Sequence, residues 1–245
     1  SPFFLFFSFH DIHVPRLPNE KFQGKTSMGP RGDAIVQMDW MTGEIVNALQ
    51  KLGIKENTLI IFTSDNGAVL NDGYEDLATE NLGNHKPSGP FRGYKYSAFE
   101  GGTRVPTIVY WPNIVTTNIT SDALLSQAAL FRSLSKLTGE TIQDNEAIDS
   151  EDHLDVWLGR SNIGRTYLLE ESAGLSLRWG DWKYIEPVKY SNIPKFITNK
   201  GIENGLDTIP QLYDLQNDIF ETTNLASTHT ELVKKIQEKL NKIKQ

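Results

Sequence analysis

Apolar runs alternate with a helical pattern in the first part of the chain. Residues from Phe3 to Phe9 are almost all apolar, as in a strand that is covered on both faces. From Asp33 to Leu52, apolar residues recur every three or four positions, which predicts a helix that ends at Gly53. Thr58 to Thr63 is a second β-rich run. A helix between two apolar strands predicts an α/β fold.

The middle of the chain continues this pattern after a long polar segment. Ser64 to Gly102 is rich in glycine and asparagine, and a connection of this length inside a compact domain is usually functional or disordered. We expect a functional loop. A third strand is predicted from Pro106 to Trp111, and an amphipathic helix from Ala123 to Leu137, before Gly139. A shorter helix is predicted from Glu151 to Leu158.

Beyond Arg160 the pattern changes to short β-like segments separated by polar turns, which predicts a small antiparallel sheet. These segments are Tyr167 to Glu170, Leu175 to Trp179, Trp182 to Glu186 and Leu212 to Leu215. A closing helix is predicted from His229 to Ile243, with Thr228 and Glu231 at capping-box spacing and an apolar stripe of Val233, Ile236, Leu240 and Ile243. We therefore expect two domains, an α/β domain over residues 1–160 and a small α+β domain over residues 161–245.

Composition and charge exclude some functions. The 245 residues include 24 Lys and Arg against 31 Asp and Glu, and the net charge of −7 argues against a nucleic-acid partner. There is no cysteine, which excludes disulfides and thiolate metal sites. The apolar run at the start is too short to span a bilayer and lacks the flanks of a signal peptide. Because termini are usually polar and exposed, we expect the chain to be part of a longer polypeptide.

Two histidines follow the first predicted strand, in the sequence His10-Asp11-Ile12-His13. Ligands bind at the carboxyl ends of strands in open α/β sheets, so these imidazoles stand where a site is expected. A histidine can donate a proton to a leaving oxygen, and two histidines at this spacing can also bind a metal. Backbone hydrogen bonds at a strand end are an equally good explanation of the pair.

The second predicted strand is followed by Asp65-Asn66-Gly67. A carboxylate and an amide carbonyl side by side are hard oxygen donors, which suit Ca²⁺ or Mg²⁺. Ca²⁺ takes about six to eight oxygen ligands, so further ligands have to come from elsewhere. In isolation, the same triplet is more often an Asx-turn.

A lysine lies in the glycine-rich segment that precedes the third predicted strand. Lys95 provides a positive charge for the oxygens of a sulfuryl or phosphoryl group, and the neighbouring glycines allow the backbone to approach closely. Without further context, a solvated surface lysine is the commoner case.

Taken together and in this order, the segments resemble the sulfatase family of the alkaline-phosphatase-like superfamily. The resemblance is carried by HDIHVP, TSDNG, FRGYKYSAFEGGTRVP and LRWGDWKYI, and it covers nearly the whole chain. It implies a partial alkaline-phosphatase-like α/β core, in which residues 1–160 are the C-terminal part of the catalytic domain. The activity it implies is hydrolysis of a sulfate monoester on a sulfated sugar or an aryl compound.

The resemblance also implies roles for particular residues. Asp65 and Asn66 correspond to ligands of an active-site Ca²⁺, with Mg²⁺ as an alternative. His13 corresponds to the imidazole at the leaving oxygen, and Lys95 to the lysine that contacts the sulfate. His10 and His85 correspond to substrate-contacting positions. Glu100 and Arg104 would hold the glycine-rich loop in shape.

In this family the nucleophile is a formylglycine made from a Cys or Ser in a C/S-x-P-x-R motif, which the resemblance places upstream of this chain. Ser88 to Arg92 matches the serine form, but the residues that follow do not continue as a nucleophile segment does, so we reject it. We therefore expect the 245-residue chain alone to be inactive. The family resemblance also implies a periplasmic or secreted location.

Two other functions fit the same residues. A phosphodiesterase or phosphonate hydrolase of the same superfamily would also use a metal, a lysine and histidines. Such enzymes tend to bind two metals through Asp and His, whereas Asn66 beside Asp65 favours a single hard cation. A degenerate sulfatase that only binds sulfated glycans is the third possibility, and the upstream nucleophile motif discriminates it from an enzyme.

Overall fold

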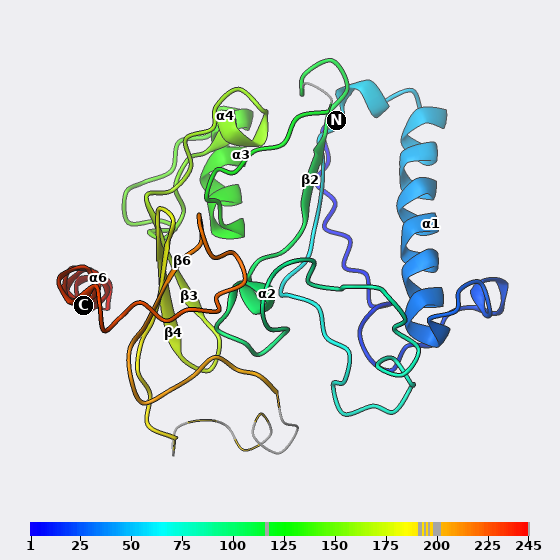
Figure 1. Ribbon diagram of the computed structural model, residues 1–245. Coiled ribbons are helices and arrows are strands. Elements are labelled where there is room, and N and C mark those ends of the chain that lie inside the picture. Colours follow the sequence, from blue (N-terminus) through cyan, green and yellow to red (C-terminus); the bar gives the residue numbers. More distant parts are fainter. Residues whose placement is uncertain (116–117, 191–192, 194, 196, 198–201, 245) are drawn as a thin grey trace. The chain divides into compact units, whose positions relative to one another are not determined.

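The computed structural model describes residues 1–115, 118–190, 193, 195, 197 and 202–244 (Figure 1). They form two compact units, which we describe separately. The first unit comprises Ser1–Thr58 and Val69–Pro87, and the second comprises Leu59–Ala68 and Ser88–Gln245. The expected domain boundary at residue 160 lies within the second unit and stays a prediction. Of the helices that the structure describes, none combines the length and apolar character that a bilayer span requires.

The first unit is built around helix α1 (Gly29–Lys51), which confirms the predicted helix and starts four residues before Asp33. The chain turns into this helix because the buried Asp33 carboxylate accepts hydrogen bonds from the backbone N–H groups of Gly24 and Thr26, at 2.7 and 2.9 Å. At the other end, Gly53 has the expected positive φ of 69°. Two short 3₁₀ helices flank α1, η1 (Glu20–Phe22) and η2 (Lys55–Asn57).

The apolar segment at the start of the chain is not a strand, so the prediction of a buried strand from Phe3 to Phe9 is wrong for this structure. The side chains are open to solvent, with Phe4 79% and Phe6 81% exposed. Among the described residues, all strand pairing occurs within β1–β2 and within β3–β6, so this segment has no neighbouring strand. An apolar run forms a buried strand only where other elements pair with its backbone and cover its faces.

In the second unit, β1 (Ile60–Thr63) pairs with β2 (Thr107–Tyr110), which confirms two predicted strands. The pairing is antiparallel, with Thr63 opposite Thr107. The end of β1 therefore lies beside the start of β2. As a result, the polar residues that follow β1 and the glycine-rich residues that precede β2 meet at one end of this two-stranded ribbon.

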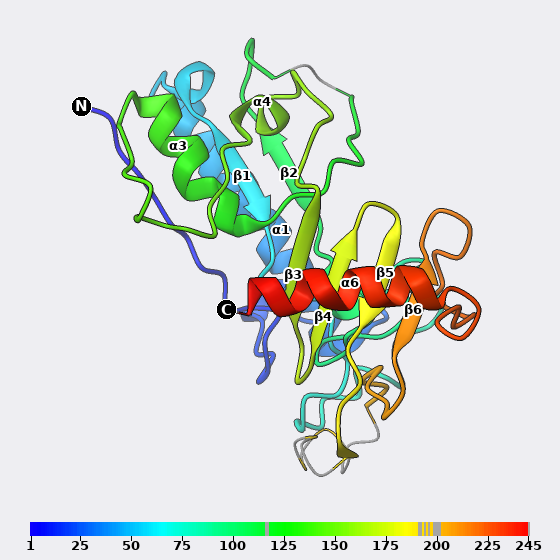
Figure 2. The ribbon, with the colours of Figure 1, turned by 90° about the vertical axis from the view of Figure 1, so that its left-hand side faces the viewer.

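The predicted small sheet is confirmed as four antiparallel strands in the order of the chain: β3 (Tyr167–Glu171), β4 (Leu175–Trp179), β5 (Trp182–Ile185) and β6 (Gln211–Asp214). Helix α6 (Thr230–Ile243) crosses one face of this sheet (Figure 2). Its buried stripe of Val233, Ile236 and Leu240 was predicted from the sequence, and it packs against Leu177 and Tyr184.

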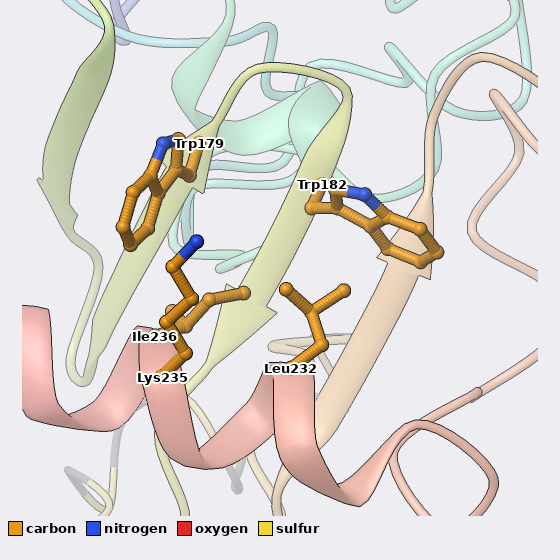
Figure 3. Close-up of a pocket in the computed structure, with 5 residues that line it drawn as sticks. All are labelled: Trp179, Trp182, Leu232, Lys235 and Ile236. Atoms are coloured by element: carbon orange, nitrogen blue, oxygen red, sulfur yellow. The ribbon is translucent and has the colours of Figure 1, made fainter.

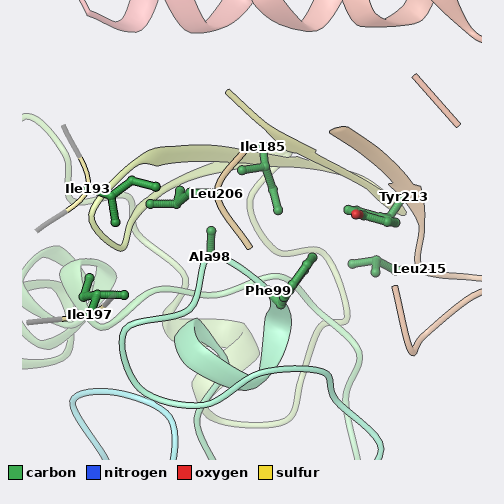
Figure 4. Close-up of a cluster of buried hydrophobic side chains, with 8 residues drawn as sticks. All are labelled: Ala98, Phe99, Ile185, Ile193, Ile197, Leu206, Tyr213 and Leu215. Carbon is green, nitrogen blue, oxygen red and sulfur yellow. The ribbon is translucent and has the colours of Figure 1, made fainter. Parts of the chain in front are cut away.

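The opposite face of the sheet packs against the glycine-rich segment and the short helix α2 (Glu100–Thr103) (Figure 4). Phe99, which precedes α2, is 2% exposed, and its ring lies 5.8 Å from that of Tyr213 on β6. Ile185 of β5 belongs to the same buried cluster. This core therefore fixes the segment that carries Lys95 to the C-terminal sheet.

A shallow pocket of about 180 Å³ lies on the α6 side of the sheet (Figure 3). It is lined by Trp179, Trp182, Leu232, Lys235 and Ile236. The Lys235 ammonium lies 5.1 Å from the centre of the Trp179 ring. The apolar side chains that line the pocket belong to the core between α6 and the sheet or pack against it. Of the residues predicted for the site, none lines this pocket.

Two helices begin later than predicted. The residues from Ala123 to Ser126 are not helical, and η3 (Gln127–Ala129) and α3 (Leu130–Thr138) follow, because the Ser126 side chain accepts a hydrogen bond from the N–H of Ala128. α4 (Leu154–Trp157) starts three residues after Glu151, where the Asp152 carboxylate accepts from the N–H of Leu154. Gly139 ends α3 with the expected left-handed conformation.

The predicted capping box of α6 is wrong. The helix starts after His229, which makes no side-chain capping bond. The Thr228 hydroxyl instead donates to the backbone carbonyl of Leu225, at 3.1 Å, so it is engaged by the preceding turn.

Candidate functional site

The turn after β1 and the glycine-rich segment before β2 are held together by backbone hydrogen bonds in the second unit. The N–H of Gly67 donates to the carbonyl of Gly102, at 2.9 Å, and the N–H of Lys95 donates to the carbonyl of Ala68, at 2.8 Å. These two bonds bring Asp65, Asn66 and Lys95 into one loop cluster.

Four glycines make this approach possible, and we call Gly67, Gly93, Gly101 and Gly102 the glycine cluster. A Cβ atom on Gly67 would lie 1.9 Å from the carbonyl oxygen of Gly101. A Cβ atom on Gly101 would lie 2.2 Å from the carbonyl oxygen of Gly93. Because the atoms in the way belong to the backbone, no other residue fits at Gly67 or Gly101 without moving the loops.

The Asp65-Asn66 pair does not form the Asx-turn that the sequence left open. The Asn66 amide nitrogen donates to the carbonyl of Gly67, at 2.9 Å, and within the described part of the chain its Oδ1 accepts no hydrogen bond. Asp65 is exposed, and its Oδ1 lies 3.5 Å from the Ser64 hydroxyl. Two oxygen donors are thus available side by side, which fits a hard cation such as Ca²⁺. In the described ranges, no three His, Cys, Asp or Glu side chains gather as a metal site, so these two would need further ligands.

Lys95 lies on a strained turn. The next residue, Tyr96, has a φ of 76°, in the left-handed region that non-glycine residues rarely occupy. The Lys95 ammonium lies 5.2 Å from the centre of the Tyr96 ring. Strained backbone of this kind persists only where the surrounding structure fixes it, and functional sites are common places for it.

The predicted histidines lie in the first unit. The N–H of His13 donates to the carbonyl of His10, at 3.1 Å, and we call His10–His13 the histidine turn. His13 Nδ1 lies 2.8 Å from the carbonyl oxygen of Val14 and must carry the proton, because a carbonyl only accepts. Its Nε2 lies 3.8 Å from a carboxylate oxygen of Asp72, and the side chain is 60% exposed. His85 is exposed in the same unit.

A buried arginine that the sequence did not single out supports the histidine turn. Arg16 is 2% exposed and donates through Nε to the carbonyl of Ile12, at 3.1 Å. Its guanidinium also pairs with Asp76, at 2.7 Å, and donates to the carbonyl of Val69. Arg16 therefore ties the histidine turn to the polar segment that contains Asp72. No pattern around Arg16 distinguishes it from a surface arginine.

A second feature that the sequence missed is a group of buried charges beneath the glycine cluster. We call Glu100, Glu170, Arg178, Lys183 and Glu221 the charge cluster. Lys183 is fully buried and binds Glu100, at 3.1 Å, and also Glu170. Arg178 pairs with Glu100 at 3.0 Å. Arg104 also lies 3.7 Å from Glu100, in line with the loop-holding role inferred for both residues.

The charge cluster shifts the pKa values of its members. Burial acts to raise the pKa of Glu100, but the charges of Lys183 and Arg178 outweigh it and hold that pKa below its usual value. Burial acts to lower the pKa of Lys183, but the charges of Glu170 and Glu100 raise it above its usual value. Glu100 and Lys183 therefore stay ionised as a buried ion pair.

The predicted site residues thus fall into two sets. Asp65, Asn66 and Lys95 are brought together in the second unit, and His10, His13 and His85 lie in the first. The gathering of both sets around one substrate stays a prediction from the family resemblance.

The comparisons with known proteins all point to the same family. A family model described as Sulfatase matches residues 1–140. An N-acetylgalactosamine-6-O-sulfatase of Bacteroides thetaiotaomicron is 45% identical over 246 residues, which cover 100% of this chain and 47% of that protein. An N-acetylgalactosamine-6-sulfatase of Mus musculus is 37% identical over 158 residues, which cover 64% of this chain and 29% of that protein. The chain spans less than half the length of these relatives.

The fold is also similar to solved structures. One, from a study of glycosaminoglycan metabolism by Bacteroides thetaiotaomicron, has a TM-score of 0.88 and 43% identity, and the match covers 96% of this chain and 49% of that one. A sulfatase from Pseudoalteromonas sp. has a TM-score of 0.71 and 26% identity, over 93% of this chain and 45% of that one.

Proposed function

Because this chain belongs to the sulfatase family, we propose that the full-length protein hydrolyses sulfate monoesters, and that this chain supplies the metal-binding turn, the lysine and the histidines of the active site. Membership in the family confirms the resemblance and the partial alkaline-phosphatase-like fold class expected from the sequence. The observation that carries the residue assignment is the loop cluster, in which Asp65, Asn66 and Lys95 lie on bonded backbone segments.

In this proposal Asp65 and Asn66 hold a Ca²⁺ ion, or Mg²⁺, through their side-chain oxygens. The bound cation would add positive charge beside the sulfate oxygens. The Lys95 ammonium provides a second charge on the sulfate. As the S–O bond to the leaving group breaks, negative charge grows on the bridging oxygen, so preorganised positive charge stabilises the transition state. His13 donates the proton that turns the leaving oxygen into a hydroxyl group, while His10 and His85 contact the substrate.

In the overall reaction, water hydrolyses the sulfate ester and releases an alcohol, a sulfate ion and a proton. The nucleophile is a formylglycine in the upstream part of the full-length protein, and the 245-residue chain alone is inactive. The substrate is a sulfated amino sugar, with 6-sulfated N-acetylgalactosamine the first to test, because the relative that matches the whole chain bears that name. A periplasmic or secreted location belongs to the same proposal.

The test uses the full-length protein with 6-sulfated N-acetylgalactosamine and a chromogenic aryl sulfate. Removing one preorganised charge or proton donor lowers kcat by about 10²–10³ in other enzymes, and we expect losses of that order for Lys95→Ala and His13→Ala. Lys136→Ala is the matched control, since the Lys136 ammonium pairs with Asp152 on the surface. Asp65→Ala should also lower the calcium content of the purified protein, whereas Lys95→Ala should not.

Other outcomes would point to the alternative functions. Hydrolysis of a phosphodiester but not of a sulfate ester would favour the phosphodiesterase reading. Binding of a sulfated glycan without turnover, together with an absent formylglycine by mass spectrometry, would favour a binding protein. Turnover of the aryl sulfate by the 245-residue chain would show that the nucleophile is not upstream.

A further inference from the structure

A buried glutamate contacts both ends of the glycine-rich segment. Glu221 has no exposed surface, and one of its carboxylate oxygens accepts the backbone N–H of Glu100, the first residue of α2, at 2.8 Å. Its backbone carbonyl accepts a hydrogen bond from the Arg92 guanidinium, at 2.6 Å. Its φ of 51° lies in the left-handed region, which is strained for glutamate. These contacts hold Glu221 in a conformation that its own backbone disfavours.

The glycine-rich segment also contacts the backbone of the metal-binding turn, Asp65–Gly67. The N–H of Gly101 donates to the carbonyl of Arg92, at 2.7 Å, and the carbonyl of Gly102 accepts from Gly67. Glu221 therefore fixes Arg92 and Glu100, and the backbone of Gly101 and Gly102, directly after Glu100, contacts the backbone of Gly67. Since Gly67 directly follows Asp65 and Asn66, a shift of α2 is passed to these two residues by main-chain contacts.

The basic side chains of the charge cluster are already paired with Glu100 and Glu170. Glu100 pairs with Lys183, Arg178 and Arg104, and Glu170 pairs with Lys183. One oxygen of Glu221, Oε1, is buried and has no hydrogen-bond partner in the described part of the chain. An ionised carboxylate there would add a third negative charge without a partner of its own.

Burial is the main cause that raises the pKa of Glu221, to about 8, and the charges of Glu100 and Glu170 act in the same direction. The charge of Lys183 and the hydrogen bond from the N–H of Glu100 favour the ionised form and act against this rise. The ionisable groups around Glu221 come from α2, the four strands of the sheet and two loops. They are Glu100, Glu170, Arg178, Lys183, Tyr213, Arg92 and Asp218.

We infer that Glu221 is a positioning residue for the Asp65–Gly67 turn, which it holds through Glu100 and Gly102. Its proton keeps a negative charge off the buried, unpartnered Oε1, and loss of that proton draws the carboxylate toward water and loosens α2. The effect is a weaker metal-binding turn above about pH 8. Only the link to metal binding rests on the proposed function; the mechanical link between Glu221 and the turn does not.

The test measures hydrogen exchange by mass spectrometry on the 245-residue chain, at about pH 6.5 and about pH 9.5, on either side of the pKa of about 8. The wild type is compared with Glu221→Gln at the same pH, which removes the intrinsic effect of pH on exchange. In the wild type, peptides over residues 59–69 and 92–104 should exchange about tenfold faster than in Glu221→Gln at the higher pH, which is the upper end of what one neutral hydrogen bond contributes. At the lower pH the two proteins should agree.

Two controls make the result specific. Peptides from α6 in the same unit should exchange alike in both proteins, which separates local loosening from unfolding. Glu186→Gln, which removes a surface pair with Lys244, should keep the wild-type pH dependence. Equal exchange of the two loop peptides in wild type and Glu221→Gln at both pH values would overturn the inference.

A measurement on the wild type alone covers the case in which Glu221→Gln does not fold. With glutamate labelled at the carboxyl carbon, nuclear magnetic resonance should show one glutamate that titrates near pH 8. The amide resonances of Gly67 and Gly101 should shift with the same midpoint. If no glutamate titrates in that range, or if the Gly67 amide does not follow it, the inference is wrong whether or not the protein is a sulfatase.

Discussion

The glycine cluster and the histidine turn position their functional side chains in different ways. In the glycine cluster, backbone packs directly against backbone, and a group of buried charges supports it from below. In the histidine turn, one buried arginine binds a carbonyl of the turn, and the His13 side chain itself stays 60% exposed. Metal ligands need fixed oxygens, whereas a proton donor has to reach a substrate atom. The difference therefore follows the roles proposed for the two regions.

The largest effect should come from the charge cluster. Lys183→Met leaves Glu100 and Glu170 buried without their lysine, and breaking a buried ion pair in this way costs about 3–5 kcal/mol. The free energy of unfolding, measured by urea denaturation, should fall by about 4 kcal/mol. Lys136→Met removes a lysine from a surface pair and should leave the urea midpoint unchanged. Equal midpoints for the two variants would mean that the charge cluster does not stabilise the second unit.

The histidine turn should respond to loss of its arginine. Arg16→Met leaves Asp76 buried and unpaired, with an expected loss of about 3 kcal/mol in the free energy of unfolding. Arg160→Met is the control, because Arg160 and Asp155 are both more than half exposed and 4.0 Å apart. If nuclear magnetic resonance showed unchanged His10 and His13 signals in folded Arg16→Met, the turn would not depend on Arg16.

A smaller effect is expected from one methyl group in the glycine cluster. The Cβ atom of Gly67→Ala would lie 1.9 Å from a backbone oxygen, and relief of such a clash typically costs about 1–3 kcal/mol. Gly43→Ala, on α1, meets no atom within 4 Å and should stabilise the helix by about 1 kcal/mol. In thermal unfolding, the melting temperature should be lower than that of the wild type for Gly67→Ala and higher for Gly43→Ala. A neutral Gly67→Ala would show that the loops separate easily.

The effect of Glu221 on stability depends on pH. Its pKa is raised from 4.5 to about 8, so the folded protein holds a proton that the unfolded chain releases. Glu221 therefore stabilises the fold fully below about pH 4.5, and this contribution is lost as the pH rises to about 8. Relative to Glu221→Gln, the wild-type unfolding free energy should fall by up to about 1.4 kcal/mol per pH unit in this window. A constant difference between the two proteins would show that Glu221 is ionised in the folded state.

The sequence predicted local elements better than their surroundings. The four strands of the small sheet and the stripe of α6 follow from alternation and helical spacing, which are local properties. The exposure of Phe3 to Phe9 could not be read from the segment, because it depends on whether another strand pairs with it. The start of α3 depended on a side-chain cap at Ser126, which shifts a helix by a few residues.

The candidate site shows the same division. Asp65, Asn66 and Lys95 were identified from their residue types and from the family resemblance, and the structure brings their segments together. Lys183 and Glu221 were missed because a buried charge looks like any surface charge in a sequence. Their contacts join residues about 80 to 120 positions apart, which no local pattern encodes.

The most direct test of the account is a crystal structure of the full-length protein with Ca²⁺ and a sulfated amino sugar, in a variant that cannot turn over. We expect one cation bound by the side-chain oxygens of Asp65 and Asn66, with the Lys95 ammonium and the His13 imidazole on the same sulfate group. A sulfate group bound elsewhere, or His13 and Lys95 in separate sites, would contradict it.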